Sequence, residues 1–214
     1  MIFDEMVYVG IEIASGSRPV IYACIDQEMN ILLLENFSLP KVITHMRQNE
    51  NIMLAVNASF RNNLASNENE TLVFEILEKE ITRAGFKPYL SNYACRQWVE
   101  TYPLDCFDSL SEQKPLPRET TTGQVQRAEI LHAQGLRLNA ARNFFAQDQD
   151  SVVNRTGKAF YTPAELDALM AASIAWMLIN RPVNIDLTRA PDQQMISIPR
   201  EEKARWRKKP VFLR

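Results

Sequence analysis

The chain has 214 residues, of which 46% are hydrophobic and 23% are charged, and its formal net charge at neutral pH is −2. These proportions are typical of a globular protein and exclude a disordered, coiled-coil or collagen-like chain. The sequence contains no run of about 18 uncharged apolar residues, so we expect no membrane-spanning helix and no membrane partner.

The two ends of the chain differ in charge. The N-terminus carries acidic side chains where a secretory signal would carry basic ones, which favours a cytoplasmic protein. Residues 200–214 contain seven Lys or Arg and two Glu. We therefore expect a single domain over residues 1–199 followed by a basic C-terminal tail over 200–214. The tail would contact nucleic acid or an acidic partner, or pack its apolar end on the body or on a second subunit of a homodimer.

Cysteine and histidine give little sign of chemistry. Cys24, Cys95 and Cys106 form no C-x-x-C pair and are expected to be free, buried thiols. The only two histidines are His45 and His132, which argues against a histidine-based zinc site or a Ser-His-Asp triad.

Three apolar runs open the sequence, over residues 7–14, 20–25 and 31–37. The segments between them contain Ser, Gly, Pro, Asp and Asn, which favour tight turns, so the runs predict a three-stranded antiparallel meander. The first run is apolar on both of its alternating faces, which is typical of a central strand covered on both sides.

A crossover is predicted next. A short helix after Ser38 leads to a buried strand over residues 51–59, which can therefore lie parallel to the first strand. A second helix starts at Glu70 and is expected to end before Gly85. A short extended segment then precedes a strand over residues 95–103.

The second half of the chain alternates between polar loops and helices. Residues 111–123 and 148–159 predict loops, and residues 124–147 predict a helix broken near its glycine. Residues 195–199 predict a short edge strand. Together the elements predict an α/β fold with a mixed five-stranded sheet, in which an antiparallel meander is followed by parallel strands and helices flank the sheet.

The clearest local signal is a helix over residues 163–180. Thr162 is the expected N-cap, Pro163 suits the first helical position and Glu165 completes a capping box. At about 100° per residue, Asp167 falls inside the apolar arc of this helix and Glu165 falls outside it. We therefore expect Glu165 to face water and Asp167 to face the protein body. A buried carboxylate needs a salt bridge, a hydrogen-bond donor or a wet cleft.

Two further acids stand alone in apolar strands, Glu12 in the first strand and Glu100 in the strand over residues 95–103. Together with Asp167 they form a suggestive set of isolated carboxylates from separate elements. Converging carboxylates bind Mg²⁺ or Mn²⁺, and paired ions can activate water and stabilise the leaving oxygen of a phosphodiester. Glu12, Glu100 and Asp167 are thus candidate ligands of magnesium or manganese.

The order of these elements, with an acid in the first strand and another in the C-terminal helix, resembles the ribonuclease H-like fold. Within it, the sequence resembles the DUF429 family of predicted nucleases over nearly the whole chain. The resemblance is carried by short patches in order along the sequence: VGIEIA, LAVNAS, VETYPLDCFDSL, TTTGQVQRAEIL and AELDALMAASIAW.

This resemblance implies a candidate catalytic set of Glu12, Asn57, Glu100 and Asp167. Glu100 and Asp167 match the acids of the family pattern, whereas Glu12 stands where the family has Asp. Asn57 also stands at an aspartate position, which implies the loss of one charge. Such a loss usually weakens metal binding.

Functions of different classes follow from these expectations. A divergent, non-catalytic or weakly active protein would bind nucleic acid or a protein partner. A divalent-metal-dependent nuclease or phosphodiesterase would instead hold its metal through Glu12, Glu100 and Asp167, with Asn57 orienting water or the scissile phosphate. A third possibility is an enzyme that handles nucleotides or phosphorylated metabolites, because the fold alone does not decide the reaction.

Overall fold

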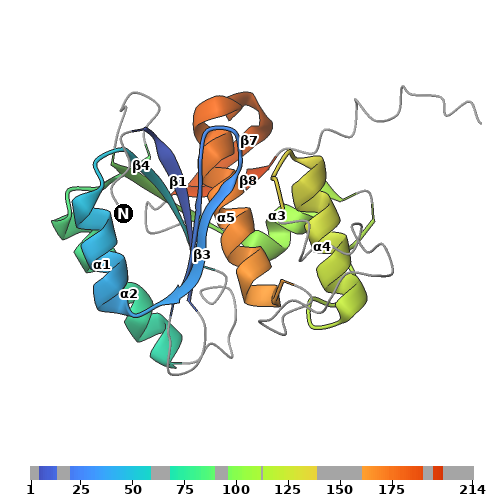
Figure 1. Ribbon diagram of the computed structural model, residues 1–214, viewed down its shortest axis with the longest axis horizontal. Helices are drawn as coiled ribbons and strands as arrows, with labels where there is room; N and C mark the ends of the chain where they lie inside the picture. The colour runs from blue at the N-terminus through green and yellow to red at the C-terminus, as the bar shows by residue number, and fades with distance from the viewer. Residues whose placement is uncertain are drawn as a thin grey trace, which may run out of the picture.

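A computed structural model describes residues 5–13, 20–58, 68–89, 96–111, 113–138, 161–189 and 195–199. The fold is α/β, with helices on both faces of one mixed sheet (Figure 1). The sheet has eight strands, in the order β3-β2-β1-β4-β6-β8-β7, and β5 pairs with β6. The predicted fold class and mixed sheet are confirmed, while the predicted number of five strands is wrong.

The first four strands match their prediction closely. β1 pairs antiparallel with β2, β2 pairs antiparallel with β3, and β4 lies parallel to β1 after the crossover. β6 and β8 continue the parallel part, and β7 pairs antiparallel with β8. The strand bounds are β1 Val7–Ile13, β2 Val20–Ile25, β3 Ile31–Phe37, β4 Ile52–Asn57, β5 Lys87–Pro88, β6 Gln97–Thr101, β7 Ile185–Arg189 and β8 Met195–Pro199.

The far end of the sheet differs from the prediction. β8 was expected to be an edge strand, but it lies between β6 and β7, and β7 forms the edge. β7 was not predicted, because its sequence, IDLTR, contains only two apolar residues. An alternation this short does not identify a strand. β5 lies inside the short extended segment predicted before the strand over residues 95–103, and it pairs only with β6.

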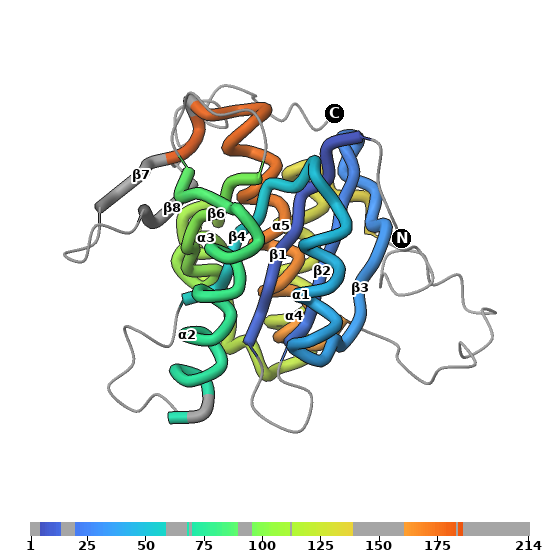
Figure 2. Tube along the Cα trace, turned by 90° about the vertical axis from the view of Figure 1, so that its left-hand side faces the viewer, coloured from blue at the N-terminus to red at the C-terminus, as the bar shows by residue number. Residues whose placement is uncertain are grey.

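α1 and α2 cover one face of the sheet, α5 covers the other, and α3 and α4 pack against α5 on that side (Figure 1). Figure 2 shows α1 and α2 in front of the sheet and α5 behind it. The helix bounds are α1 Leu39–Gln48, α2 Glu68–Arg83, α3 Pro103–Leu110, α4 Thr121–Ala133 and α5 Pro163–Asn180, followed by a 3₁₀ turn over Pro182–Asn184.

Glycine ends two of the helices, and proline begins another. Gly85 has a φ of 87° just beyond α2, and Gly135 has a φ of 107° just beyond α4, so both occupy the left-handed region that stops a helix. The helix α3 was not predicted, because Pro103 was interpreted only as the end of a strand. Pro103 is instead the first residue of α3, a position that suits its fixed φ.

α4 starts at Thr121, inside the segment predicted as a loop over residues 111–123. The expected continuation of this helix to residue 147 and the loop over 148–159 lie outside the described residues. The basic tail over 200–214 also lies outside them.

The capping box of α5 is confirmed, since Thr162 Oγ1 accepts from the Glu165 backbone N–H at 3.2 Å. The same box corrects the expectation that Glu165 faces water. Its carboxylate accepts a hydrogen bond from the Thr162 backbone N–H at 2.8 Å, and the residue is only 5% exposed. Almost the whole circumference of α5 is buried between the sheet and the neighbouring helices.

Every residue of β1 is buried, as predicted for a central strand covered on both sides. Val7, Val9 and Ile11 pack toward α1 and α2, whereas Tyr8 packs toward α5. Cys24 and Cys106 are buried and form no disulfide, as expected. Within the described ranges, no helix is long and apolar enough to cross a bilayer.

Candidate functional site

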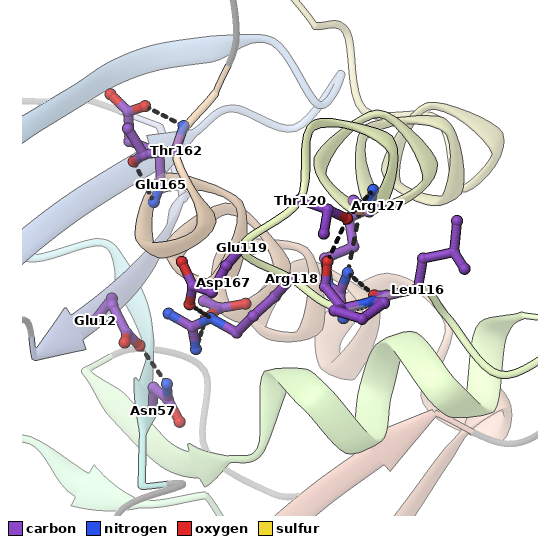
Figure 3. A network of polar contacts seen from close by, with 12 residues as sticks. Glu12, Asn57, Leu116, Arg118, Glu119, Thr120, Arg127, Thr162, Glu165 and Asp167 are labelled. Carbon is purple, nitrogen blue, oxygen red and sulfur yellow. Dashed lines mark hydrogen bonds and ion pairs between the residues drawn. The ribbon is translucent and has the colours of Figure 1, made fainter.

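The candidate site lies where β1 and β4 end. Their parallel register pairs Ile11 with Val56, so the next residues, Glu12 and Asn57, lie side by side with their side chains on the α5 face. Asn57 Nδ2 donates a hydrogen bond to Glu12 Oε2 (Figure 3). The carboxyl ends of parallel strands are where open α/β sheets usually bind ligands.

Gly10 brings α5 down onto this end of the sheet. A Cβ at this position would lie 1.9 Å from the backbone oxygen of Ala168 and 2.4 Å from the backbone nitrogen of Ala172. Only glycine therefore permits the contact between helix and strand. Asp167 precedes Ala168 and is fully buried, which confirms the prediction that it faces the body.

Glu100 does not join this group. The register of β4 and β6 pairs Val56 with Glu100 and Asn57 with Thr101, so Thr101 is the β6 residue on the α5 face. Glu100 points to the opposite face, toward the layer of α1 and α2, and is 1% exposed. The structure therefore brings Glu12, Asn57 and Asp167 together and leaves the predicted third carboxylate behind the sheet.

Arg118 is the site residue that sequence reasoning missed. Its Nη1 lies 2.8 Å from Asp167 Oδ2, and its Nε lies 3.1 Å from Glu119 Oε1. Figure 3 shows the Arg118 side chain reaching from the segment before α4 toward Glu12 and Asn57. The available signal was indirect, since a buried Asp167 required a partner and an arginine-bearing loop could supply one.

The segment that carries this arginine is fixed to α4. Arg127 Nη1 donates to the backbone oxygens of Leu116, at 2.8 Å, and Gly123, at 3.1 Å. Thr120 Oγ1 donates to the backbone oxygen of Pro117 at 2.8 Å and accepts from the Gly123 N–H at 3.0 Å. A Cβ on Gly123 would lie 2.1 Å from the Pro117 oxygen, so the close approach depends on this glycine. We call these contacts the α4 brace.

Burial dominates the protonation of the two acids. It raises the pKa of Glu12 from 4.5 to about 8, and the nearby Asp167 carboxylate adds to the rise, while Asn57 and Arg118 oppose it. Burial also raises the pKa of Asp167 from 3.8 to about 6, against the lowering effect of Arg118 and Arg127. At neutral pH, Glu12 is thus mostly protonated and Asp167 is mostly ionised.

The donor set fits a divalent metal poorly. It offers two carboxylates, of which one is mostly protonated and the other is paired with a guanidinium, and one amide whose nitrogen faces Glu12. Among the residues that the structure describes, no group of three or more His, Cys, Asp or Glu side chains is arranged to hold a metal ion. Mg²⁺ and Mn²⁺ favour ionised oxygen ligands.

Comparisons with known protein families, with curated proteins and with solved structures found no significant match to the chain. A functional proposal therefore depends on the residues of the site and on the arrangement of the strands and helices around it.

Proposed function

We propose that the chain is a divergent relative of the DUF429 family with a ribonuclease H-like fold, and that it binds nucleic acid or a protein partner with little or no catalysis. The arrangement of the elements supports the fold. The meander β1–β3 leads through α1 to β4 beside β1, and the acid-bearing helix α5 covers the face opposite α1 and α2. These are the features on which the sequence resemblance to that fold rests.

The hydrogen bond between Asn57 and Glu12 carries the non-catalytic part of the proposal. Two carboxylates on these adjacent strands would repel each other and would favour a cation between them. An amide that donates to a carboxyl group satisfies it without a metal. The pair of side chains is therefore stable in the absence of the ion that phosphodiester cleavage requires.

A nucleic-acid assay tests this proposal. Labelled single- and double-stranded DNA and RNA would be titrated with the full chain, with and without millimolar Mg²⁺ or Mn²⁺. We expect salt-sensitive binding without cleavage. Binding to none of the four substrates would shift the proposal to a protein partner or a homodimer, and efficient metal-dependent cleavage would contradict it.

A divalent-metal-dependent nuclease or phosphodiesterase is the second candidate. It is favoured by the convergence of Glu12 and Asp167, which lie close enough for Asp167 to raise the pKa of Glu12. Mg²⁺ or Mn²⁺ would then be held by these two acids, and Asp167→Asn would abolish cleavage. An activity that survives Asp167→Asn would exclude this site as its origin.

A further inference from the structure

We infer that Arg118 is a tethered cation that closes the acidic site against divalent metal ions. The inference rests on the proposed function, in which the acids descend from a metal-dependent site. It adds one residue role to that proposal: the Arg118 side chain, from the segment before α4, supplies the positive charge that a metal ion would otherwise supply.

The position of Arg118 is the first support. Its guanidinium contacts Asp167, whose side chain is 1% exposed, while its own side chain is 31% exposed. The arginine therefore lies between the buried acid and solvent and reaches toward the Glu12–Asn57 pair (Figure 3). A divalent ion approaching Asp167 would meet a fixed positive charge at contact distance.

The oxygens of Asp167 give independent support. Within the described part of the chain, neither oxygen of this buried carboxylate has a hydrogen-bond partner; Oδ2 makes the ion pair with Arg118, and Oδ1 makes no such contact. A carboxylate that served only as a salt-bridge partner would normally have both oxygens satisfied, for example by the bidentate geometry that arginine favours. Asp167 therefore retains an oxygen that a second cation could take.

Arg118 can leave Asp167 by rotation of its side chain alone, because the α4 brace holds the backbone and Glu119 offers a second carboxylate. The brace fixes the backbone on both sides of Arg118, so the segment itself need not move. Glu119 is 75% exposed and already contacts Arg118 Nε. Rotation of the arginine away from Asp167 would thus leave it paired with Glu119 at the surface.

Removal of the guanidinium should uncover a cation site. Glu12 and Asp167 would then lie without a positive charge between them, and Asn57 would supply a third oxygen after rotation of its amide. We expect Arg118→Gln to bind Mn²⁺ at least about tenfold more tightly than the wild type. The double variant Arg118→Gln/Asp167→Asn should lose this gain.

Electron paramagnetic resonance of Mn²⁺, which separates free from bound ion, measures the effect on the full chain. Arg83→Gln is the matched control, because it removes one positive charge from α2, where the side chain is 70% exposed, and should behave as the wild type. Arg118→Lys keeps the charge and should also keep the site closed.

Two results would overturn the inference. One is a folded Arg118→Gln protein that binds Mn²⁺ no better than the wild type or the Arg83→Gln control. The second concerns an Arg118→Gln protein that does not fold alone. Mn²⁺ should then restore the circular dichroism signal of the folded protein, and no recovery on addition of Mn²⁺ would overturn the inference. Neither result bears on nucleic-acid binding by the wild type, so the proposed function and this inference fail separately.

Discussion

Glu12 lies on the central strand between two isoleucines, where it is 7% exposed. Its carboxyl group is held by the amide of Asn57 on the next strand, and its charge is suppressed by burial. Asp167 is also a buried acid, but its charge is balanced by an ion pair with Arg118. The two acids of the site therefore differ in protonation at neutral pH, and this difference can be measured.

The free energy of unfolding should fall as the pH rises through the window set by Glu12. The folded-state pKa of about 8 lies above the ordinary value of 4.5, so the folded protein binds more protons than the unfolded chain between these values, and deprotonation costs stability. Glu12→Gln cannot ionise at this position and should lack this loss, most clearly above about pH 7, where Asp167 is mostly ionised.

Urea unfolding of both proteins between about pH 6 and about pH 9 measures this effect. Glu12→Gln should be the more stable protein at the upper end of the range. Identical slopes of unfolding free energy against pH would mean that Glu12 is ionised in the folded protein at neutral pH.

At this scale, the sequence predicts a part of the site. Asp167 was placed correctly because helical periodicity identifies the buried side of α5. Glu100 was grouped with the wrong acids, although counting from Trp98 in steps of two places both on the face of α1 and α2. The sequence shows that Asp167 needs a partner but does not identify Arg118 as that partner, since the contact joins residues about fifty positions apart through a segment without periodicity.

At the scale of elements, the contact between α5 and β1 depends on Gly10. Gly10→Ala would drive a methyl group into the helix backbone, which cannot move like a flexible side chain. We expect a loss of about 3 kcal/mol in the free energy of unfolding, measured by urea denaturation. Gly85→Ala is the control, because its nearest atom is 3.7 Å away and only its φ is unfavourable, which should cost about 1 kcal/mol. Equal losses in the two variants would contradict the close approach.

The α4 brace gives a second prediction at this scale. Arg127→Met removes the donor to two backbone oxygens while keeping a long apolar side chain, and should destabilise the protein by about 1–3 kcal/mol. Arg137→Met removes an exposed arginine whose side-chain contact is 3.3 Å long, and should change stability by less than about 0.5 kcal/mol. Thermal unfolding of both variants compares them, and a neutral Arg127→Met would show that the brace contributes nothing.

The predictability of the elements follows their length and their caps. The meander, the crossover and α5 were predicted because each has a long apolar period and clear turn or cap residues. β7 was missed because its five residues include only two apolar ones, and α3 because its eight residues begin at the last position of the strand predicted over residues 95–103. A short element takes its structure from the neighbours on which it packs, and these are unknown from sequence.

At the scale of the whole molecule, net positive charge is concentrated in residues 200–214, which contain seven Lys or Arg and two Glu. This segment lies outside the described residues. Deletion of this segment should weaken binding to nucleic acid and should lower the slope of log affinity against log salt by up to about 5. Fluorescence anisotropy at several salt concentrations measures both quantities. An unchanged slope would move the nucleic-acid surface to residues 1–199.

The central claim for the molecule is that its two acids are satisfied without a metal: burial suppresses the charge of Glu12, which is hydrogen-bonded to Asn57, and Arg118 from the segment before α4 supplies the counter-charge of Asp167. Calorimetric titration of the full wild-type chain with Mn²⁺ tests it most directly. The account predicts no saturable heat of binding at millimolar metal. Saturable binding that Asp167→Asn abolishes would contradict it and would favour a metal-dependent phosphodiesterase.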